Sequence, residues 1–215
     1  LGPADLELQI PTYQSSATSN SDDYVCFSIP TNLSQNKKIR AIEVIPGNPQ
    51  IVHHVLVSID LAPNTPPMTL NCMGPQGDLI YAYAPGSSPL IYPVNLNNTF
   101  GVELTANSSI SLGMHYPEGS SGQWDSTKVR FYFHPQNTTI REITTDFLIN
   151  EGLFPNPPFI LPPHQITQVS GSFGPTMQDY SLMSVFPHMH LLGKDLECYA
   201  VTPTNDTINL IKINK

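Results

Sequence analysis

The segment from Pro187 to Lys194 carries two histidines, His188 and His190, separated by a single residue. Alternate residues of a β-strand point to the same face, so both imidazole rings would project side by side if this segment is a strand. Two rings placed in this way can share one metal ion. The alternative is a pair of solvated histidines at a strand edge, and so short a motif does not decide between them.

Other histidines strengthen the metal hypothesis. His53 and His54 interrupt the apolar run from Ile51 to Ile59, where burying two polar rings is costly unless both are engaged. Adjacent strand residues point to opposite faces, so these two would share a metal only if a bulge or a strong twist re-aims one of them. His115 lies at the end of another predicted strand, close to Gly113. The remaining histidines of the chain are His134 and His164.

Three histidine-bearing strands in a small β-rich chain favour a metal site over isolated core or surface histidines. The site would be rich in imidazole and poor in carboxylate and thiolate, which favours copper or zinc over calcium or magnesium. The sequence contains no G-x-S-x-G elbow, P-loop, G-x-G-x-x-G or H-E-x-x-H motif that would indicate another reaction class.

The composition predicts an all-β chain. Twenty-two prolines and thirteen glycines among 215 residues disfavour long helices, and no segment combines helical periodicity with caps at both ends. Charged residues make up only 12% of the chain, and the net charge is −8, so we expect no nucleic-acid partner. No apolar run approaches the roughly 20 residues that span a membrane, so we expect no membrane partner.

Short strands separated by turns predict a β-sandwich. We place a domain boundary between residues 137 and 138, which gives an N-terminal domain (1–137) and a C-terminal domain (138–215). The C-terminal domain has too few predicted strands to close a sandwich, so we expect it to be incomplete. The predicted strands are Leu6–Ile10, Tyr24–Ile29, Ile39–Ile45, Ile51–Ile59, Leu79–Ala84, Phe100–Leu104, Ser109–Tyr116, Lys128–His134, Ile140–Ile149, Gln165–Phe173, Leu196–Val201 and Thr207–Lys215.

The three cysteines, Cys26, Cys72 and Cys198, have no zinc-finger or C-x-x-C spacing. Their number permits one disulfide with one thiol left over, or three buried thiols. The N-terminus lacks the basic and apolar regions of a signal peptide, so we expect a mature or trimmed form.

The ordered motifs make the chain resemble the copper type II, ascorbate-dependent monooxygenases, the family of peptidylglycine α-hydroxylating monooxygenase and dopamine β-monooxygenase. Val52–Val55 looks like the His-His motif of that family, and Met114–Tyr116 like its third-histidine segment. His188–Lys194 is similar to its H-x-H-x-x-G-K motif, the most specific part of the match. Tyr24–Cys26 and Asn71–Cys72 fall where the family carries a disulfide.

The resemblance implies two antiparallel, jelly-roll-like β-sandwich domains, each with one copper ion facing a shared cleft. His53, His54 and His115 would hold the copper that stores and delivers an electron. His188 and His190 would hold the catalytic copper, where O2 binds and a substrate C–H bond is hydroxylated. Ascorbate would supply the electrons, and the substrate would be a small molecule or a peptide with an apolar C–H donor.

The resemblance also implies a Cys26–Cys72 disulfide, with Cys198 free or paired outside this chain. It implies a secreted, extracellular or periplasmic protein. Two positions depart from the family pattern. The family's methionine ligand lies well downstream of its H-x-H motif, and only twenty-five residues follow His190, so we expect the chain to be a fragment. Phe186 stands where the peptide-hydroxylating member has a substrate-binding arginine.

The sequence therefore predicts a copper monooxygenase. One alternative is a non-catalytic, secreted metal-binding β-sandwich protein that serves in storage or adhesion. A second is a zinc hydrolase, which is disfavoured because no acidic residue adjoins the histidine motifs as a general base.

Overall fold

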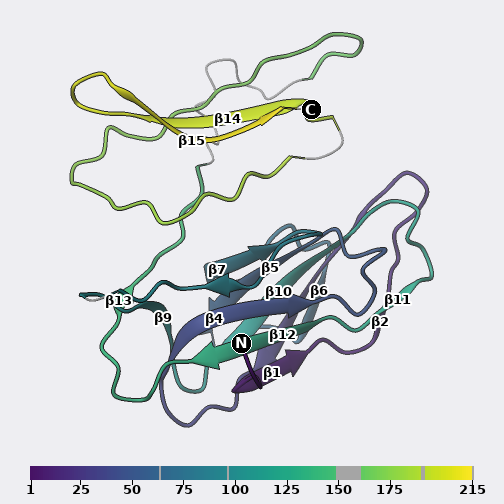
Figure 1. Cartoon of the computed structure of the whole chain (residues 1–215). Helices are drawn as coiled ribbons and strands as arrows, with labels where there is room; N and C mark the ends of the chain where they lie inside the picture. Colours follow the sequence, from purple (N-terminus) through teal and green to yellow (C-terminus); the bar gives the residue numbers. More distant parts are fainter. Residues whose placement is uncertain (63, 96, 149–160, 190–191, 215) are drawn as a thin grey trace. The chain divides into compact units, whose positions relative to one another are not determined.

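A computed structural model describes most of the chain. It divides into two compact units, Leu1–Asp146 and Phe147–Lys215 (Figure 1). The described residues contain no helix long and apolar enough to cross a lipid bilayer. The prediction that residues 1–137 and 138–215 form two sandwich domains, each with a copper site, stays a prediction. The described residues are 1–62, 64–95, 97–148, 161–189 and 192–214.

The first unit contains a six-stranded sheet. Its strands pair antiparallel, apart from the short parallel contact between β13 and β9. In spatial order they are β1 (Leu6–Gln9), β12 (Lys128–Phe133), β4 (Lys37–Ile45), β9 (Phe100–Leu104) and β13 (Arg141–Glu142), with β8 (Leu90–Ile91) on β4.

The first unit also contains a five-stranded antiparallel sheet, in which β10 lies at the centre between β3 and β5. His115 of β10 is paired in register with Tyr24 of β3 on one side and His54 of β5 on the other. The strands are β6 (Met68–Leu70), β3 (Asp23–Pro30), β10 (Ser109–Tyr116), β5 (His54–Asp60) and β7 (Asp78–Tyr83), and a separate pair joins β2 (Tyr13–Gln14) to β11 (Trp124–Asp125).

Both sheets contribute side chains to one hydrophobic core. Alternate residues of β10 point into this core, while Ser111, Gly113 and His115 lie on the opposite face of the strand. Removing each large apolar side chain from water contributes roughly 1.5–3 kcal/mol. The core residues of β10 are Ile110, Leu112, Met114 and Tyr116.

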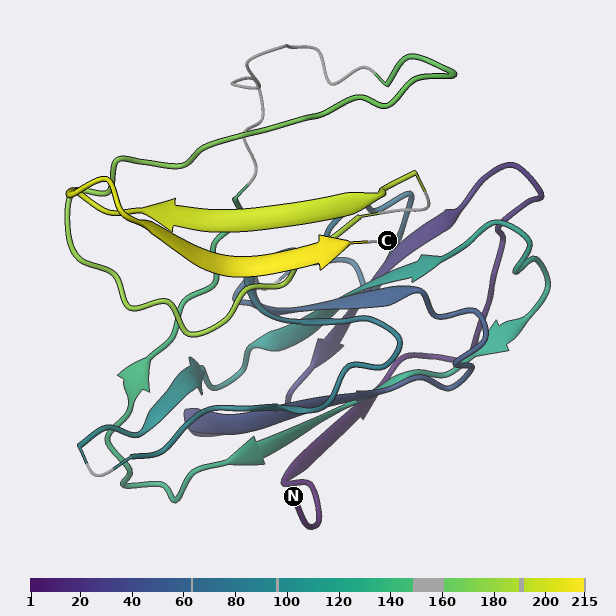
Figure 2. The same ribbon diagram turned by 45° about the horizontal axis from the view of Figure 1, so that its top comes forward.

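Among its described residues, the second unit has one two-stranded sheet, formed by β14 (Asp195–Val201) and β15 (Thr207–Asn214) and drawn in yellow in Figure 2. The predicted strand at Gln165–Phe173 is wrong, because no regular secondary structure forms between residues 165 and 173. Ile166 in that segment is 92% exposed, so its side chain does not pack against a neighbouring strand. The predicted strand at Ile140–Ile149 reduces to the two residues of β13 over its described part.

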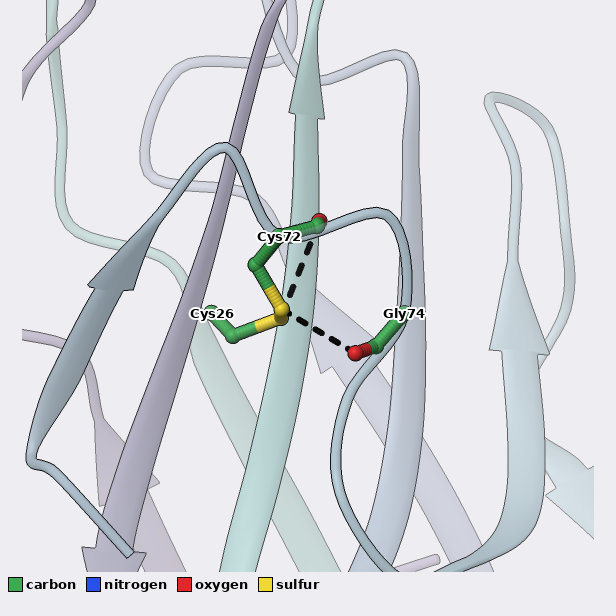
Figure 3. Close-up of a disulfide and its surroundings, with 3 residues drawn as sticks. All are labelled: Cys26, Cys72 and Gly74. Carbon is green, nitrogen blue, oxygen red and sulfur yellow. Dashed lines mark hydrogen bonds between the residues drawn. A yellow bond between two sulfur atoms is a disulfide. The ribbon is translucent and has the colours of Figure 1, made fainter.

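A disulfide joins Cys26 of β3 to Cys72 in the loop after β6 (Figure 3). The Cα atoms are 5.6 Å apart, and the Cys72 N–H donates to the Tyr24 carbonyl oxygen at 3.2 Å. The same loop covers Gly113, where an added Cβ would come within 2.8 Å of Pro75. A disulfide indicates an oxidising compartment, such as the secretory route or the periplasm.

The structure confirms an all-β chain with several antiparallel sheets. The jelly-roll sandwich arrangement stays a prediction.

Candidate metal centre

The two strands that meet at the centre of the five-stranded sheet bring three histidines together. His54 is the first residue of β5, and His115 is the penultimate residue of β10. His53 immediately precedes β5, so strand alternation does not direct its side chain. Its backbone N–H instead donates to the His115 carbonyl oxygen at 3.0 Å. This local geometry lets the adjacent pair His53 and His54 face the same point without a bulge inside the strand.

The spacing of the three ring nitrogens fits a metal ion. Nδ1 of His54 lies 3.2 Å from Nδ1 of His53 and 3.2 Å from Nδ1 of His115. The possible ligand atoms of all three residues lie within 4.8 Å of one another. A histidine nitrogen binds zinc at about 2.0–2.1 Å, so two nitrogens at a tetrahedral angle around the ion lie roughly 3.3 Å apart. The cluster could therefore bind one metal ion through three nitrogens.

The cluster lies on the face of the sheet opposite the hydrophobic core. His115 is 2% exposed and His54 is 8% exposed, whereas His53 is only half-buried. Burying imidazole rings is costly unless their nitrogens are engaged, and a shared metal ion would engage all three. A donor set of three imidazoles suits copper or zinc better than calcium or magnesium.

Asp22 extends the cluster to a carboxylate that the sequence interpretation did not identify. Its Oδ2 lies 2.9 Å from Nε2 of His115, the ring nitrogen that faces away from the other histidines. Partial burial by itself would raise the pKa of Asp22. The hydrogen bond from the Glu118 N–H and the nearby His115 ring outweigh this effect, so the pKa lies below its usual value.

Tyr24 covers one face of the His115 ring. The Tyr24 and His115 rings are stacked, with centroids 4.3 Å apart and planes 8° from parallel. Burial, and then the nearby Asp22 carboxylate, raise the pKa of the Tyr24 hydroxyl. The stack follows from strand register, because Tyr24 and His115 are direct partners across β3 and β10.

The H-x-H segment differs from the expectation. His188 lies in residues 178–189, a stretch without regular secondary structure, so the strand geometry that would project both rings from one face does not form at this histidine. His190 lies outside the described residues. Within the described part of the chain, the group formed by His53, His54 and His115 is the one cluster that could hold a metal. The second copper site stays a prediction.

The remaining candidates are His134, His164 and Cys198. Nε2 of His134 is 3.0 Å from the Phe100 carbonyl oxygen, a contact between the first residue of β9 and the residue just after β12. His164 lies in a turn with a φ of 61°. Cys198 of β14 is a free, half-buried thiol. None of these three belongs to the histidine cluster.

Comparisons with known proteins found no matching family model, no matching curated protein and no matching solved structure. The firm result is an all-β protein with a buried cluster of three histidines.

Proposed function

We propose that this chain is a copper-dependent monooxygenase that hydroxylates an unactivated C–H bond with O2 and a reductant such as ascorbate. The observation that carries the proposal is the convergence of three Nδ1 atoms from His53, His54 and His115 at spacings that suit one ion. A ligand set of imidazoles alone supports copper in both oxidation states. The H-x-H-x-x-G-K motif from His188 to Lys194 supplies the second part of the proposal.

In this mechanism the two groups of histidines have different tasks. His53, His54 and His115 hold an electron-storing ion on the outer face of the five-stranded sheet, with two of the three rings shielded from water. His188 and His190 would hold the second ion, and the substrate would bind beside it. Copper would supply one-electron transfer and dioxygen activation. Phe186, two residues before His188, offers an apolar rather than a charged wall to the substrate.

The test measures copper stoichiometry and ascorbate-dependent oxygen consumption together. We expect two copper ions per chain and oxygen uptake that requires ascorbate, with hydrogen peroxide measured in parallel so that uptake from uncoupled turnover can be subtracted. His115→Ala should remove one ion and spare the other, and His188→Ala should remove the second. His134→Ala is the matched control, because His134 lies outside the cluster.

Three outcomes would contradict the proposal. Loss of both ions in each variant, or of neither, would exclude two separate sites. Copper binding without ascorbate-dependent oxygen uptake would favour a non-catalytic metal-binding protein, an alternative consistent with the single cluster among the described residues. Zinc binding with hydrolytic activity would favour the hydrolase.

A further inference from the structure

We propose that Asp22 is a positioning residue for the metal centre, which aims Nδ1 of His115 at the ion and sets the charge around it. This inference rests on the metal site of the proposed function and not on its monooxygenase chemistry. Asp22 lies immediately before β3, and His115 lies near the end of the neighbouring strand β10. The two residues are 93 positions apart and meet through strand register.

The tautomer of His115 decides which ring nitrogen can bind the metal. A neutral imidazole has one N–H, and its other nitrogen is the metal ligand. Nε2 of His115 is 2.9 Å from Oδ2 of Asp22. At this distance the negative carboxylate favours a proton on Nε2 over a proton on Nδ1. Nδ1 then presents its lone pair to the other histidines, 3.2 Å from Nδ1 of His54. A carboxylate behind a ligating histidine also makes the ligand more basic.

Further contacts hold the Asp22 carboxylate and the His115 ring in place. Oδ1 of Asp22 accepts the Glu118 backbone N–H at 2.8 Å, which ties the carboxylate to the segment just after β10. Tyr24 stacks on the His115 ring and fixes its plane. The ring of His115 is therefore held by the nearby carboxylate at its edge and by an aromatic face, and both contacts come from the β3 side of the sheet.

Asp22 also changes the net charge around the metal centre. The cluster itself has three neutral ligands, and Asp22 adds a negative charge one ring away from the ion. A negative charge at that position stabilises Cu(II) relative to Cu(I), because the more highly charged ion gains more from it. Removing the charge should therefore raise the reduction potential of the bound copper.

The test compares Asp22→Asn, Asp22→Ala and Glu118→Gln. Asparagine keeps an acceptor for the Nε2 proton but removes the charge, whereas alanine removes both. Glu118→Gln is the matched control, since it removes an exposed charge from the same neighbourhood and keeps the backbone N–H that binds Asp22. Copper affinity is titrated against a competing chelator, the reduction potential of the bound ion is measured, and thermal melting confirms that each variant is folded.

We expect Asp22→Ala to weaken copper binding by about 10–100-fold. Asp22→Asn should weaken binding less than Asp22→Ala, and it should raise the reduction potential more than Glu118→Gln does. Affinities and potentials that match those of the control for both Asp22 variants would overturn the proposal.

A measurement without metal separates this proposal from the proposed function. In the metal-free protein, long-range proton–nitrogen NMR correlations report which nitrogen of His115 is protonated. We expect the Nε2–H tautomer in the unaltered chain and in Glu118→Gln, and a mixture of tautomers in Asp22→Ala. The same tautomer in all three proteins would overturn the role of Asp22, whether or not copper binds. Failure of the unaltered chain to bind copper, with the tautomers as expected, would overturn the metal site.

Discussion

The two units of the chain bury their apolar side chains very differently. In Leu1–Asp146, two sheets share one core, and Leu112 and Phe131 are fully buried within it. In Phe147–Lys215, the single hairpin leaves Val201 60% exposed, and none of the described residues of this unit belongs to the core. Two strands alone are marginally stable, because they cannot cover an apolar face. Strand pairing without a second layer therefore gives secondary structure but not a buried site.

The largest expected difference concerns independent folding. A polypeptide of residues 1–146 should unfold in one cooperative transition, because it contains the complete core and the disulfide. A polypeptide of residues 147–215 should show no cooperative transition. Circular dichroism during heating measures both, with the whole chain as the reference. A sharp transition in the 147–215 polypeptide would contradict the comparison.

The next effect concerns the disulfide of the first unit. Replacing both Cys26 and Cys72 by serine should lower the free energy of unfolding by about 4 kcal/mol in the chain-entropy model, because the bond closes a long loop. Cys198→Ser is the matched control and should change stability little. Urea unfolding measures the difference. Thiol counting in denaturant without reductant should find one free thiol, and finding three would exclude the disulfide.

Truncating one side chain in each unit sharpens the contrast. Leu112→Ala should cost roughly 2–5 kcal/mol, because it leaves a cavity in the core. Ile208→Ala in β15 should cost less than about 1 kcal/mol, because Ile208 is already 52% exposed. Denaturant midpoints of the two variants in the whole chain provide the measurement. Equal losses would show that the hairpin is packed in solution.

Polar contacts in the two units should also differ in strength. The Tyr116 hydroxyl donates to the buried Asp125 carboxylate at 3.0 Å, so Tyr116→Phe should cost roughly 1–3 kcal/mol. The exposed Lys212–Glu197 pair of the hairpin, at 3.2 Å, should contribute only a few tenths of a kcal/mol, and added salt should remove that contribution. Unfolding of Tyr116→Phe and Lys212→Met at low and high salt compares them.

The folding stability of the first unit should also depend on pH, because of Tyr116. Burial, and then Asp125, raise the pKa of its hydroxyl in the folded protein. Above about pH 10 the tyrosine ionises in the unfolded chain but not in the folded one, so folding stability falls as pH rises. Tyr116→Phe should lose less stability between pH 9 and pH 11 than the unaltered chain.

The sequence predicted those elements whose signal is local. Ser109–Tyr116 was predicted as a strand and is β10, because its apolar residues alternate cleanly. Gln165–Phe173 has similar residues but forms no strand, since a strand also needs a partner that the local sequence does not specify. Pairing is a property of the whole chain, and periodicity does not report it.

The site shows the same limit. The types and spacing of His53, His54 and His115 indicated a metal, but strand alternation could not say whether His53 and His54 share one. The answer depends on β5 beginning at His54, a boundary that periodicity locates poorly. Asp22 was missed because it reaches His115 only through strand register. The acidic pair Asp22-Asp23 just before a predicted strand was the one available signal.

The alternation of β10 makes the metal centre a check on strand register. A slip of one residue would turn His115 towards the core and Leu112 towards the outer face, so one error would damage both the apolar packing and the ligand set. It would also put a side chain in place of Gly113 beneath the Pro75 loop. A misregistered chain could therefore not bind the ion as a correctly registered one does. Metal binding would then distinguish chains in which β10 pairs with β3 and β5 in the correct register from chains in which it does not.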